Sequence, residues 1–409
     1  MASRRGLFLT QWFEPEPIMK GLRFAQGLVD AGFEVEVATG FPNYPTGKLA
    51  PGYRLRPHAS ETMEGIQVHR LFLVPSHDTS GLGRAVNYIS FFLSALVFCV
   101  LRGRRFDVIY VYHPPITVGL AAAISGLTTR TPFILDVQDL WPESVVASGF
   151  DGTHRLGGIL ARICEFVYRR SSMVVSQSRA MRGALFDRGL APDKVVTIFN
   201  WADEETARAR GEYDVSVLGF EGHFNIVYGG NLGRLQDLET VIRAALLASR
   251  DVPNIKLTLV GDGVDRQRLS DLVEALDTPH VQLIGAVPQT QIGDIFAAAD
   301  VLLLHLLDDP AFAVTIPSKA QFYMAMGRPI LAGVRGEAAD IVVGCGAGVA
   351  VVPQDVAAMA AGMVQMAGLS SVERARMGER ARAAYEVGFS YLKGMEATVT
   401  CLGRPELAR

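Results

Sequence analysis

Short apolar runs alternate with stretches of helical spacing along almost the whole chain, and this alternation most constrains the fold. In the first half, apolar runs of strand length occur at residues 7–10, 35–39, 108–112, 133–137, 173–176 and 195–199. Residues 21–31, 117–126 and 157–170 have helical spacing and lie between such runs. Continuous apolar strands separated by helices indicate a parallel sheet covered by helices on both faces.

The alternation stops at residues 201–222, which are polar and read as a linker, and then restarts. Further strands are predicted at 225–228, 256–261, 281–285, 301–304, 330–332 and 348–352, and helices at 237–249, 264–276, 291–298 and 318–326. The chain is almost entirely helical from Val356 onward. The pattern therefore predicts two doubly wound domains, residues 1–203 and 204–388, followed by a segment 389–409. Such folds bind ligands at the carboxyl ends of their strands, so we expect a cleft there.

Length and charge narrow the class of protein. A chain of 409 residues suits two domains of about 200 residues. The 39 basic and 42 acidic residues argue against general electrostatic binding of nucleic acid. The four cysteines are far apart in sequence, which indicates neither a zinc cluster nor a disulfide framework and favours a reducing cytoplasm. The apolar residues 6–10 are too few for a signal-peptide core.

A glycine-rich turn at residues 229–234 follows a predicted strand and precedes a helix. Glycines let a backbone approach a ligand closely, a helix N-terminus attracts anions, and Arg234 adds a permanent charge. These features suit diphosphate binding, although a tight strand-to-helix turn with a surface arginine would have the same sequence pattern. A second turn, residues 261–263, contains Asp262, which either caps the next helix or contacts the same ligand.

Three further residues of the second half lie at the starts of predicted helices. Ser318 is placed to cap a helix, and Lys319 lies in its first turn, where a cation opposes the helix dipole. A bound phosphate would remove that conflict, and a solvated lysine pointing away is the alternative. Glu337 either stabilises a helix N-terminus or accepts hydrogen bonds from sugar hydroxyls, and the sequence does not separate these roles.

Polar residues also follow strands of the first half. Gln138, Asp139, Trp141 and Glu143 come directly after the strand 133–137. Carboxylates and amides suit sugar hydroxyls, an indole suits a sugar ring, and two carboxylates suit acid–base work. In the alternative, Asp139 caps a helix and Trp141 packs in the core.

Two more loops of the first half are predicted to reach the same sheet edge. The loop 40–47 offers Asn43 and Tyr44 between prolines and glycines, and we read it as a binding loop. His113 follows another strand, where it is either structural or functional.

Together these segments resemble glycosyltransferase family 4, a retaining GT-B family. The nearest branch is that of bacterial polysaccharide enzymes, including N-acetyl-L-fucosaminyltransferases. The most specific matches are residues 40–47, 139–144, 230–234, 317–319 and 327–329. The resemblance implies two Rossmann-like α/β domains facing a cleft, with the acceptor on the first and a nucleotide sugar on the second. It implies no metal or other cofactor, and a final helix that packs back on the first domain.

The resemblance also implies roles for individual residues. Donor contacts fall on Gly230, Asn231, Leu232, Arg234, Gly261, Asp262, Ala286, Val287, Ser318, Lys319 and Glu337. Acceptor contacts fall on Asn43, Tyr44, His113, Gln138 and Trp141, with Asp139 or Glu143 orienting the acceptor. Arg234 and Lys319 would stabilise the leaving diphosphate.

This chain departs from the wider family at four positions. Gln138 stands where a histidine is common, Val314 and Phe322 where two glutamates are common, and Gln236 where a lysine is common. The polysaccharide branch shares such departures, and it makes UDP and an N-acetylated deoxysugar the expected donor and a polyprenyl-diphosphate-linked or free glycan the acceptor. A catalytically inactive sugar- or nucleotide-binding protein and a sugar-nucleotide epimerase on the same fold remain the competing hypotheses.

The segment from Ala85 to Leu101 raises the question of a membrane. It is apolar on nearly all sides, and arginines follow it at 102, 104 and 105. We read it first as a buried helix, because helices that are apolar all round are usually buried. The second interpretation is a helix at a membrane surface with the arginines at the headgroups, which would make a cytoplasmic enzyme peripheral on the inner face of the membrane.

Overall fold

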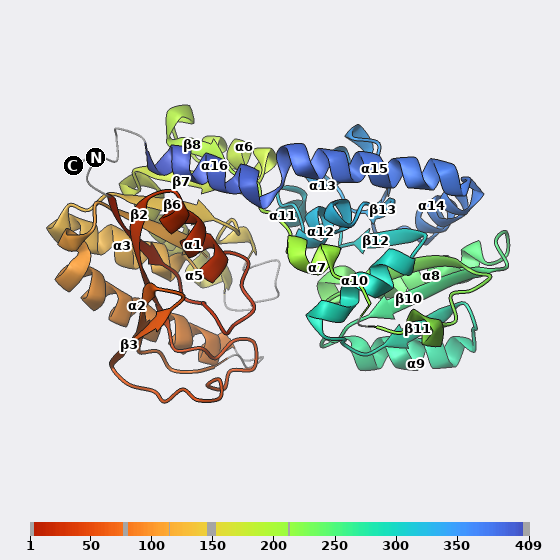
Figure 1. The fold of residues 1–409 in the computed structure, drawn as a ribbon, viewed down its shortest axis with the longest axis horizontal. Coiled ribbons are helices and arrows are strands. Elements are labelled where there is room, and N and C mark those ends of the chain that lie inside the picture. Colours follow the sequence, from red (N-terminus) through yellow and green to blue (C-terminus); the bar gives the residue numbers. More distant parts are fainter. Residues whose placement is uncertain (1–3, 77–80, 114, 145–152, 212, 404–409) are drawn as a thin grey trace. The chain divides into compact units, whose positions relative to one another are not determined.

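The computed structural model describes residues 4–76, 81–113, 115–144, 153–211 and 213–403, except for the side chains of residues 113 and 153–156 (Figure 1). The chain divides into two compact units. Unit 1 comprises Met1–Phe199 with Gly394–Arg409, and unit 2 comprises Asn200–Lys393. The predicted boundaries, after residues 203 and 388, lie within a few residues of these.

Unit 1 is built on an eight-stranded sheet of order β3-β4-β2-β1-β5-β6-β7-β8. Its strands are β1 (Arg4–Leu9), β2 (Phe33–Gly40), β3 (His58–Met63), β4 (Ile66–Leu71), β5 (Val108–His113), β6 (Phe133–Val137), β7 (Met173–Ser176) and β8 (Val195–Thr197). Its helices are α1 (Leu22–Asp30), α2 (Gly81–Arg102), α3 (Ile116–Thr129), α5 (Thr153–Arg170) and α6 (Arg179–Asp187), and α16 (Tyr391–Leu402) lies mostly within it. All strand pairs are parallel except β3–β4.

The hairpin β3–β4 was missing from the sequence-based prediction, because its residues are too polar to read as buried strands. The structure compensates the polar side chains by pairing. His69 is 2.8 Å from the Glu36 carboxylate, and the Arg70 guanidinium binds Glu61 at 2.6 Å. A charged residue can lie inside a sheet when it is paired, which strand patterns do not reveal.

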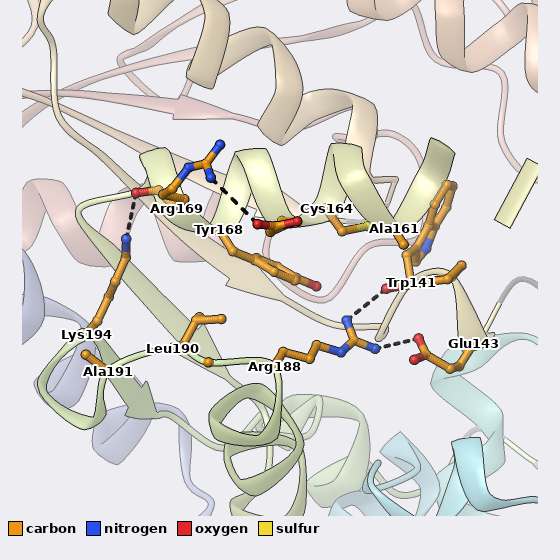
Figure 2. A pocket seen from close by; sticks show the side chains of 13 residues that line it. Trp141, Glu143, Ala161, Cys164, Tyr168, Arg169, Arg188, Leu190, Ala191 and Lys194 are labelled. Atoms are coloured by element: carbon orange, nitrogen blue, oxygen red, sulfur yellow. Dashed lines mark hydrogen bonds and ion pairs between the residues drawn. The ribbon is translucent and has the colours of Figure 1, made fainter. Parts of the chain in front are cut away.

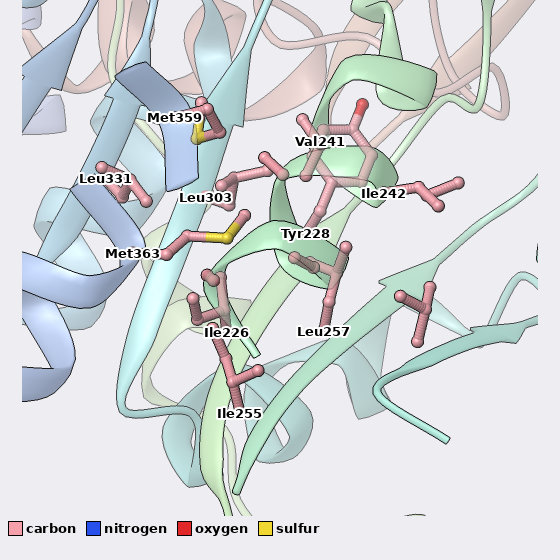
Figure 3. Close-up of a cluster of buried hydrophobic side chains, with 14 of the residues drawn as sticks. Ile226, Tyr228, Val241, Ile242, Ile255, Leu257, Leu303, Leu331, Met359 and Met363 are labelled. Atoms are coloured by element: carbon pink, nitrogen blue, oxygen red, sulfur yellow. The ribbon is translucent and has the colours of Figure 1, made fainter. Parts of the chain in front are cut away.

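Unit 2 holds a six-stranded, all-parallel sheet of order β11-β10-β9-β12-β13-β14. Its strands are β9 (Phe224–Gly229), β10 (Ile255–Val260), β11 (Val281–Ile284), β12 (Val301–His305), β13 (Ile330–Gly333) and β14 (Gly348–Val351). Its helices are α7 (Glu204–Arg208), α8 (Leu238–Ala248), α9 (Arg266–Leu276), α10 (Gln289–Ala298), α11 (Pro310–Ala313), α12 (Ser318–Met326), α13 (Glu337–Gly344), α14 (Val356–Gly368) and α15 (Ser371–Gly388). Tyr228 and Leu257 from the sheet pack with Val241 of α8 and Met359 of α14 in its core (Figure 3). The prediction of two Rossmann-like α/β units with parallel sheets is confirmed.

The polar stretch 201–222 is not a free linker, and this prediction is wrong. Trp201 is buried in unit 2, with its ring centroid 5.4 Å from that of Tyr391. Glu204 begins α7 and accepts hydrogen bonds from the Tyr385 hydroxyl at 3.0 Å and the Tyr391 amide at 2.9 Å. The charges that suggested a linker thus serve as helix caps and buried acceptors.

Helix α2 is buried on one face only, so the reading of residues 85–101 as a wholly buried helix is wrong. Its buried residues are Asn87, Phe91, Ala95, Phe98 and Cys99. Its exposed apolar residues are Leu82, Val86, Ile89, Leu93, Val97, Val100 and Leu101. The average hydropathy of the helix did not show that the protein leaves one side uncovered.

Candidate functional site

The strand order of unit 2 reverses between β9 and β12, and ligands of doubly wound sheets bind at such a switch point. The turn after β9 contains Gly230, Asn231 and Leu232. The chain after β12 leads to α12, which begins at Ser318. The topology therefore brings the first glycine-rich turn and the segment with Lys319 to the same place in the sheet.

The two glycine-rich turns of unit 2 are hydrogen-bonded to each other. The Gly230 amide donates to the Val260 carbonyl at 2.8 Å, and the Leu232 amide donates to the Asp262 carbonyl at 2.8 Å. Gly261 has φ of +142°, and a Cβ built on it would lie 1.9 Å from the Gly230 oxygen. Only glycine fits at this position. Glycines of these turns were expected to let a ligand approach the backbone, and Gly261 also lets the two turns pack against each other.

Replacing Gly261 with alanine is expected to lower the free energy of unfolding by about 1–3 kcal/mol, as overpacking does, because the new methyl group meets backbone rather than a movable side chain. Urea unfolding measures this loss. Gly222→Ala is the matched control, since Gly222 also has positive φ (+73°) but a methyl group added there would meet no atom within 4 Å. Equal losses in the two variants would show that contact with Gly230 is unimportant.

Arg234 follows the first turn and lies in a short 3-10 segment, Arg234–Gln236, ahead of α8. Its side chain is exposed, and among the described residues it makes no hydrogen bond or ion pair. Its nearby acid, Asp265, is instead held by Arg268 at 2.7 Å, and this bonding lowers the pKa of Asp265. The Arg234 guanidinium therefore remains available to an anion.

Lys319 does not point away into solvent. A Cβ built on Gly230 would lie 2.6 Å from Lys319 Cε, and the ammonium is 5.1 Å from the centroid of the Tyr228 ring. Burial of the ammonium lowers its pKa to about 8. No carboxylate forms an ion pair with it in the part of the chain that the structure describes, so the protein holds an unpaired, partly buried cation against the glycine turn.

Two predicted helix caps are wrong. Ser318 is the first residue of α12, and Pro317 occupies the N-cap position. Asp262 does not cap α9, whose N-cap is Asp265, but accepts a hydrogen bond from the Gly263 amide at 2.8 Å.

The remaining donor-side candidates also lie at carboxyl ends of strands. Glu337 is the first residue of α13, where its charge suits the helix dipole. Ala286 and Val287 follow β11 at the edge of the sheet.

Sequence reasoning missed the groups that hold the first turn. The Tyr228 hydroxyl donates to the Asn231 carbonyl at 2.7 Å, and the Gly229 amide donates to the Tyr323 hydroxyl at 3.3 Å. Both tyrosines are buried. Each looked like an ordinary core aromatic in sequence, and the need of a buried hydroxyl for a partner was the available clue.

His305 at the end of β12 supports the same turn. Its Nδ1 is 2.8 Å from the Gln236 carbonyl, and its Nε2 accepts from the Gln354 amide at 3.3 Å. These partners assign a neutral ring protonated on Nδ1. Burial lowers its pKa below the ordinary value.

This burial gives unfolding a pH dependence. Below about pH 6.5 the unfolded chain binds a proton on His305 that the folded protein resists, so stability falls as the pH drops from about 7 toward 5. We expect His305→Gln to reduce that pH-dependent loss in urea unfolding, while His223→Gln, at an exposed position, leaves it unchanged. An unaltered pH profile in His305→Gln would contradict the neutral assignment.

In unit 1, the end of β6 holds a buried charge network. Asp136 pairs with the ammonium of Lys20 and accepts a hydrogen bond from Tyr110 at 2.7 Å. The Gln138 side-chain amide donates to Asp136 Oδ1 at 2.6 Å, and the Gln138 backbone carbonyl accepts from the Gln177 side-chain amide at 2.6 Å. Gln138 is thus oriented by an ion pair that the sequence did not suggest.

The two candidate carboxylates differ in environment. Glu143 is exposed and pairs with Arg188, which also donates to the Trp141 carbonyl at 2.9 Å. Asp139 makes no hydrogen bond or ion pair to any described residue, and burial raises the pKa of its carboxyl group. An unpaired, desolvated carboxylate at a strand end is the better acceptor for a hydroxyl proton or hydrogen bond.

Glu16 holds the backbone of the loop that contains Asn43 and Tyr44. The buried Glu16 carboxylate accepts from the amides of Asn43 and Tyr44, both at 2.7 Å. The Asn43 side chain is itself buried and donates to the Phe41 carbonyl at 3.0 Å, whereas Tyr44 is half-buried against Trp12. Asn43 therefore positions the loop. The side chain of His113 lies outside the described residues.

A cavity of about 540 Å³ opens at Trp141 and Glu143, within unit 1. Trp141, Glu143 and Arg188 form one side, and Tyr168 with Lys194 lie farther along it (Figure 2). Its wall combines an indole, a phenol and charged groups. Trp141 thus lines a cavity rather than filling the core, which removes the alternative reading of this residue.

Comparisons with known families agree with this division of the chain. Residues 22–201 match the model of the glycosyl transferase 4-like domain, and residues 212–384 match that of the glycosyl transferases group 1. The first match includes Asp139, and the second includes both glycine-rich turns and Lys319.

Individual proteins are similar as well. The chain is 27% identical to the probable glycosyltransferase WbjE of Pseudomonas aeruginosa over 56% of its own length and 58% of that protein's length. It is 28% identical to the putative colanic acid biosynthesis glycosyl transferase WcaI of Escherichia coli K12 over 73% and 75%. Anabaena HepE, solved with UDP and glucose, has the same fold, with a TM-score of 0.70 at 17% identity, covering 98% of this chain and 99% of that one.

Proposed function

Because the chain belongs to the glycosyltransferases of the GT-B type, we propose that it is a retaining enzyme of bacterial surface polysaccharide synthesis. It transfers a sugar, an N-acetylated deoxysugar by preference, from a UDP-linked donor to a glycan carried on a polyprenyl diphosphate. The WcaI name supports the polysaccharide context. UDP in the HepE structure supports the nucleotide.

One observation carries this proposal: the ammonium of Lys319 lies unpaired against Gly230, in the same part of unit 2 as the exposed Arg234. Two cations beside a turn that only glycine can form suit a diphosphate. A diphosphate that approaches the backbone of this turn interacts with both positive charges. Asn231, Leu232, Gly261 and Asp262 complete the turns, and Ser318, Glu337, Ala286 and Val287 extend the donor site around them.

The charge change of the reaction assigns the roles. Breaking the sugar–phosphate bond places negative charge on the leaving diphosphate, which Arg234 and Lys319 stabilise. The acceptor hydroxyl attacks the same face of the sugar, and its proton passes to the leaving phosphate. Asp139 accepts a hydrogen bond from the acceptor and orients it, while Gln138, Tyr44, Trp141, His113 and Glu143 bind the rest of the acceptor. No metal takes part.

A thermal-shift screen of nucleotide sugars tests the donor assignment, since a ligand bound to the native state raises stability by about 2.7 kcal/mol at 100 times its Kd. We expect UDP-sugars to stabilise the chain more than GDP-sugars. Release of UDP only when a glycan acceptor is present supports transfer. Conversion of the donor without acceptor indicates an epimerase, and binding without turnover indicates an inactive binding protein.

A further inference from the structure

Helix α2 presents an apolar stripe to solvent. Leu82, Val86, Ile89, Leu93, Val97 and Val100 recur at intervals of three or four residues, which places them on one face of the helix. They are between 41% and 77% exposed. A continuous stripe of this length differs from scattered surface residues, which need no explanation, and marks an interaction surface.

The charges of helix α2 itself are of one sign. Helix α2 and the turn that follows it, Gly81–Arg105, contain no acidic residue, and arginines stand at 84, 102, 104 and 105. We propose that this stripe binds an anionic lipid surface, with the aliphatic side chains among the acyl chains and the exposed Arg104 and Arg105 at the headgroups. Aliphatic residues on one face with basic residues at the ends are the pattern of a helix that lies in the membrane interface.

The fold excludes a helix that crosses the membrane, although Gly81–Arg105 is long and apolar enough to do so. Strand β4 ends at Leu71 before α2, and β5 begins at Val108 after it. Both strands belong to one sheet, so a crossing helix would place two parts of that sheet on opposite sides of the bilayer. The buried face of α2, with Phe91 and Phe98, also packs within unit 1.

The other side of α2 reaches the acceptor residues. Asn87 accepts from the Gln11 amide at 2.6 Å and donates to the Asn43 side chain at 3.3 Å, at the start of the predicted acceptor loop. The Tyr88 ring centroid lies 6.4 Å from that of Trp141. A lipid surface held by α2 would bring a lipid-linked glycan close to Trp141 and Asp139. This step of the inference rests on the proposed function, whereas binding of the stripe to lipid does not.

Sedimentation of the full chain with vesicles tests the inference. We expect the protein to pellet with phosphatidylglycerol vesicles at low salt and much less with phosphatidylcholine vesicles. A triple variant, Ile89→Gln with Leu93→Gln and Val97→Gln, should lower the partition coefficient at least about tenfold, because it removes three aliphatic side chains whose transfer from water drives the binding. Arg104→Gln with Arg105→Gln should lower it about tenfold on anionic vesicles.

A matched control removes apolar surface elsewhere. Val217, Val372 and Val387 of unit 2 are at least as exposed as the three stripe residues, and their triple glutamine variant should bind vesicles like the unaltered protein. Absence of the unaltered protein from the pellet, or equal loss in both triple variants, overturns the inference. So does a stripe that holds two chains together, seen as a dimer that the stripe variant converts to monomer without any vesicle binding.

The binding of UDP separates this inference from the proposed function. We expect all these variants to keep the thermal stabilisation by UDP, which depends on unit 2. A variant that loses vesicle binding but still binds UDP has lost only the function of the stripe. Failure of UDP to bind the unaltered protein would contradict the proposed function without affecting the lipid-binding result.

Discussion

Replacing Arg234 with alanine is expected to lower turnover at saturating donor and acceptor by about 100-fold or more, the usual effect of removing one donor that stabilises a developing anion. The guanidinium lies beside the first glycine-rich turn and has no partner in the described protein, so its whole charge is available to the leaving diphosphate. Initial rates of UDP release at saturating substrates measure the effect.

Two further variants sharpen this experiment. Arg250→Ala removes another exposed arginine of unit 2, just after α8, and should leave turnover unchanged. Arg234→Lys keeps the charge but loses the planar fork, so an intermediate rate is expected. Turnover by Arg234→Ala within a few-fold of the unaltered enzyme would remove Arg234 from the mechanism.

Replacing Lys319 with methionine should produce a loss of similar size, about 100-fold in turnover, together with weaker UDP binding. Methionine keeps an unbranched stem against Gly230 and Tyr228 and removes the ammonium group, with its charge and its hydrogen-bond donors. The pKa of about 8 adds a second readout. Above pH 8 the ligand-free lysine is neutral and must take up a proton when the diphosphate binds, so the Kd for UDP should rise up to about tenfold per pH unit between pH 8 and 9.

Lys319→Met should abolish this pH dependence, because no titrating ammonium remains. Lys393→Met, at an exposed position in unit 2, is the control and should retain both the affinity and its pH dependence. Calorimetry of UDP binding at pH 7, 8 and 9 measures both quantities. A pH dependence that persists in Lys319→Met would show that another group titrates, and would leave Lys319 as a packing residue.

The prediction of elements from sequence succeeded where side-chain burial is uniform. Strands 133–137 and 173–176 have the predicted bounds, as does the helix 318–326. Buried parallel strands are apolar on both faces, so each is visible in its own few residues. The hairpin β3–β4 was not predicted, because its polar residues are tolerated only through partners on other strands. Residues 201–222 were mistaken for a linker, because their charged residues serve as helix caps and hydrogen-bond acceptors within unit 2.

The candidate site was predictable as a set of positions. Turns at the carboxyl ends of strands can be predicted from sequence, and Gly230, Asp139 and Trp141 were found in this way, whereas Lys319 was found from its place at the start of a predicted helix. Their states were not predictable. The pattern of residues offered no reason to separate Asp139 from Glu143, yet Arg188 neutralises only Glu143.

The amino-acid sequence by itself determined the class of fold and nominated the candidate site residues, because periodicity and glycine placement are local properties. The tertiary structure alone decided which charges are paired, which are desolvated, and which face of α2 is left bare. Pairing and desolvation depend on residues distant in sequence, such as Tyr228 with Lys319 or Gln11 with Asn87. The electrostatic state of a group is set by those neighbours, and local patterns contain no information about them.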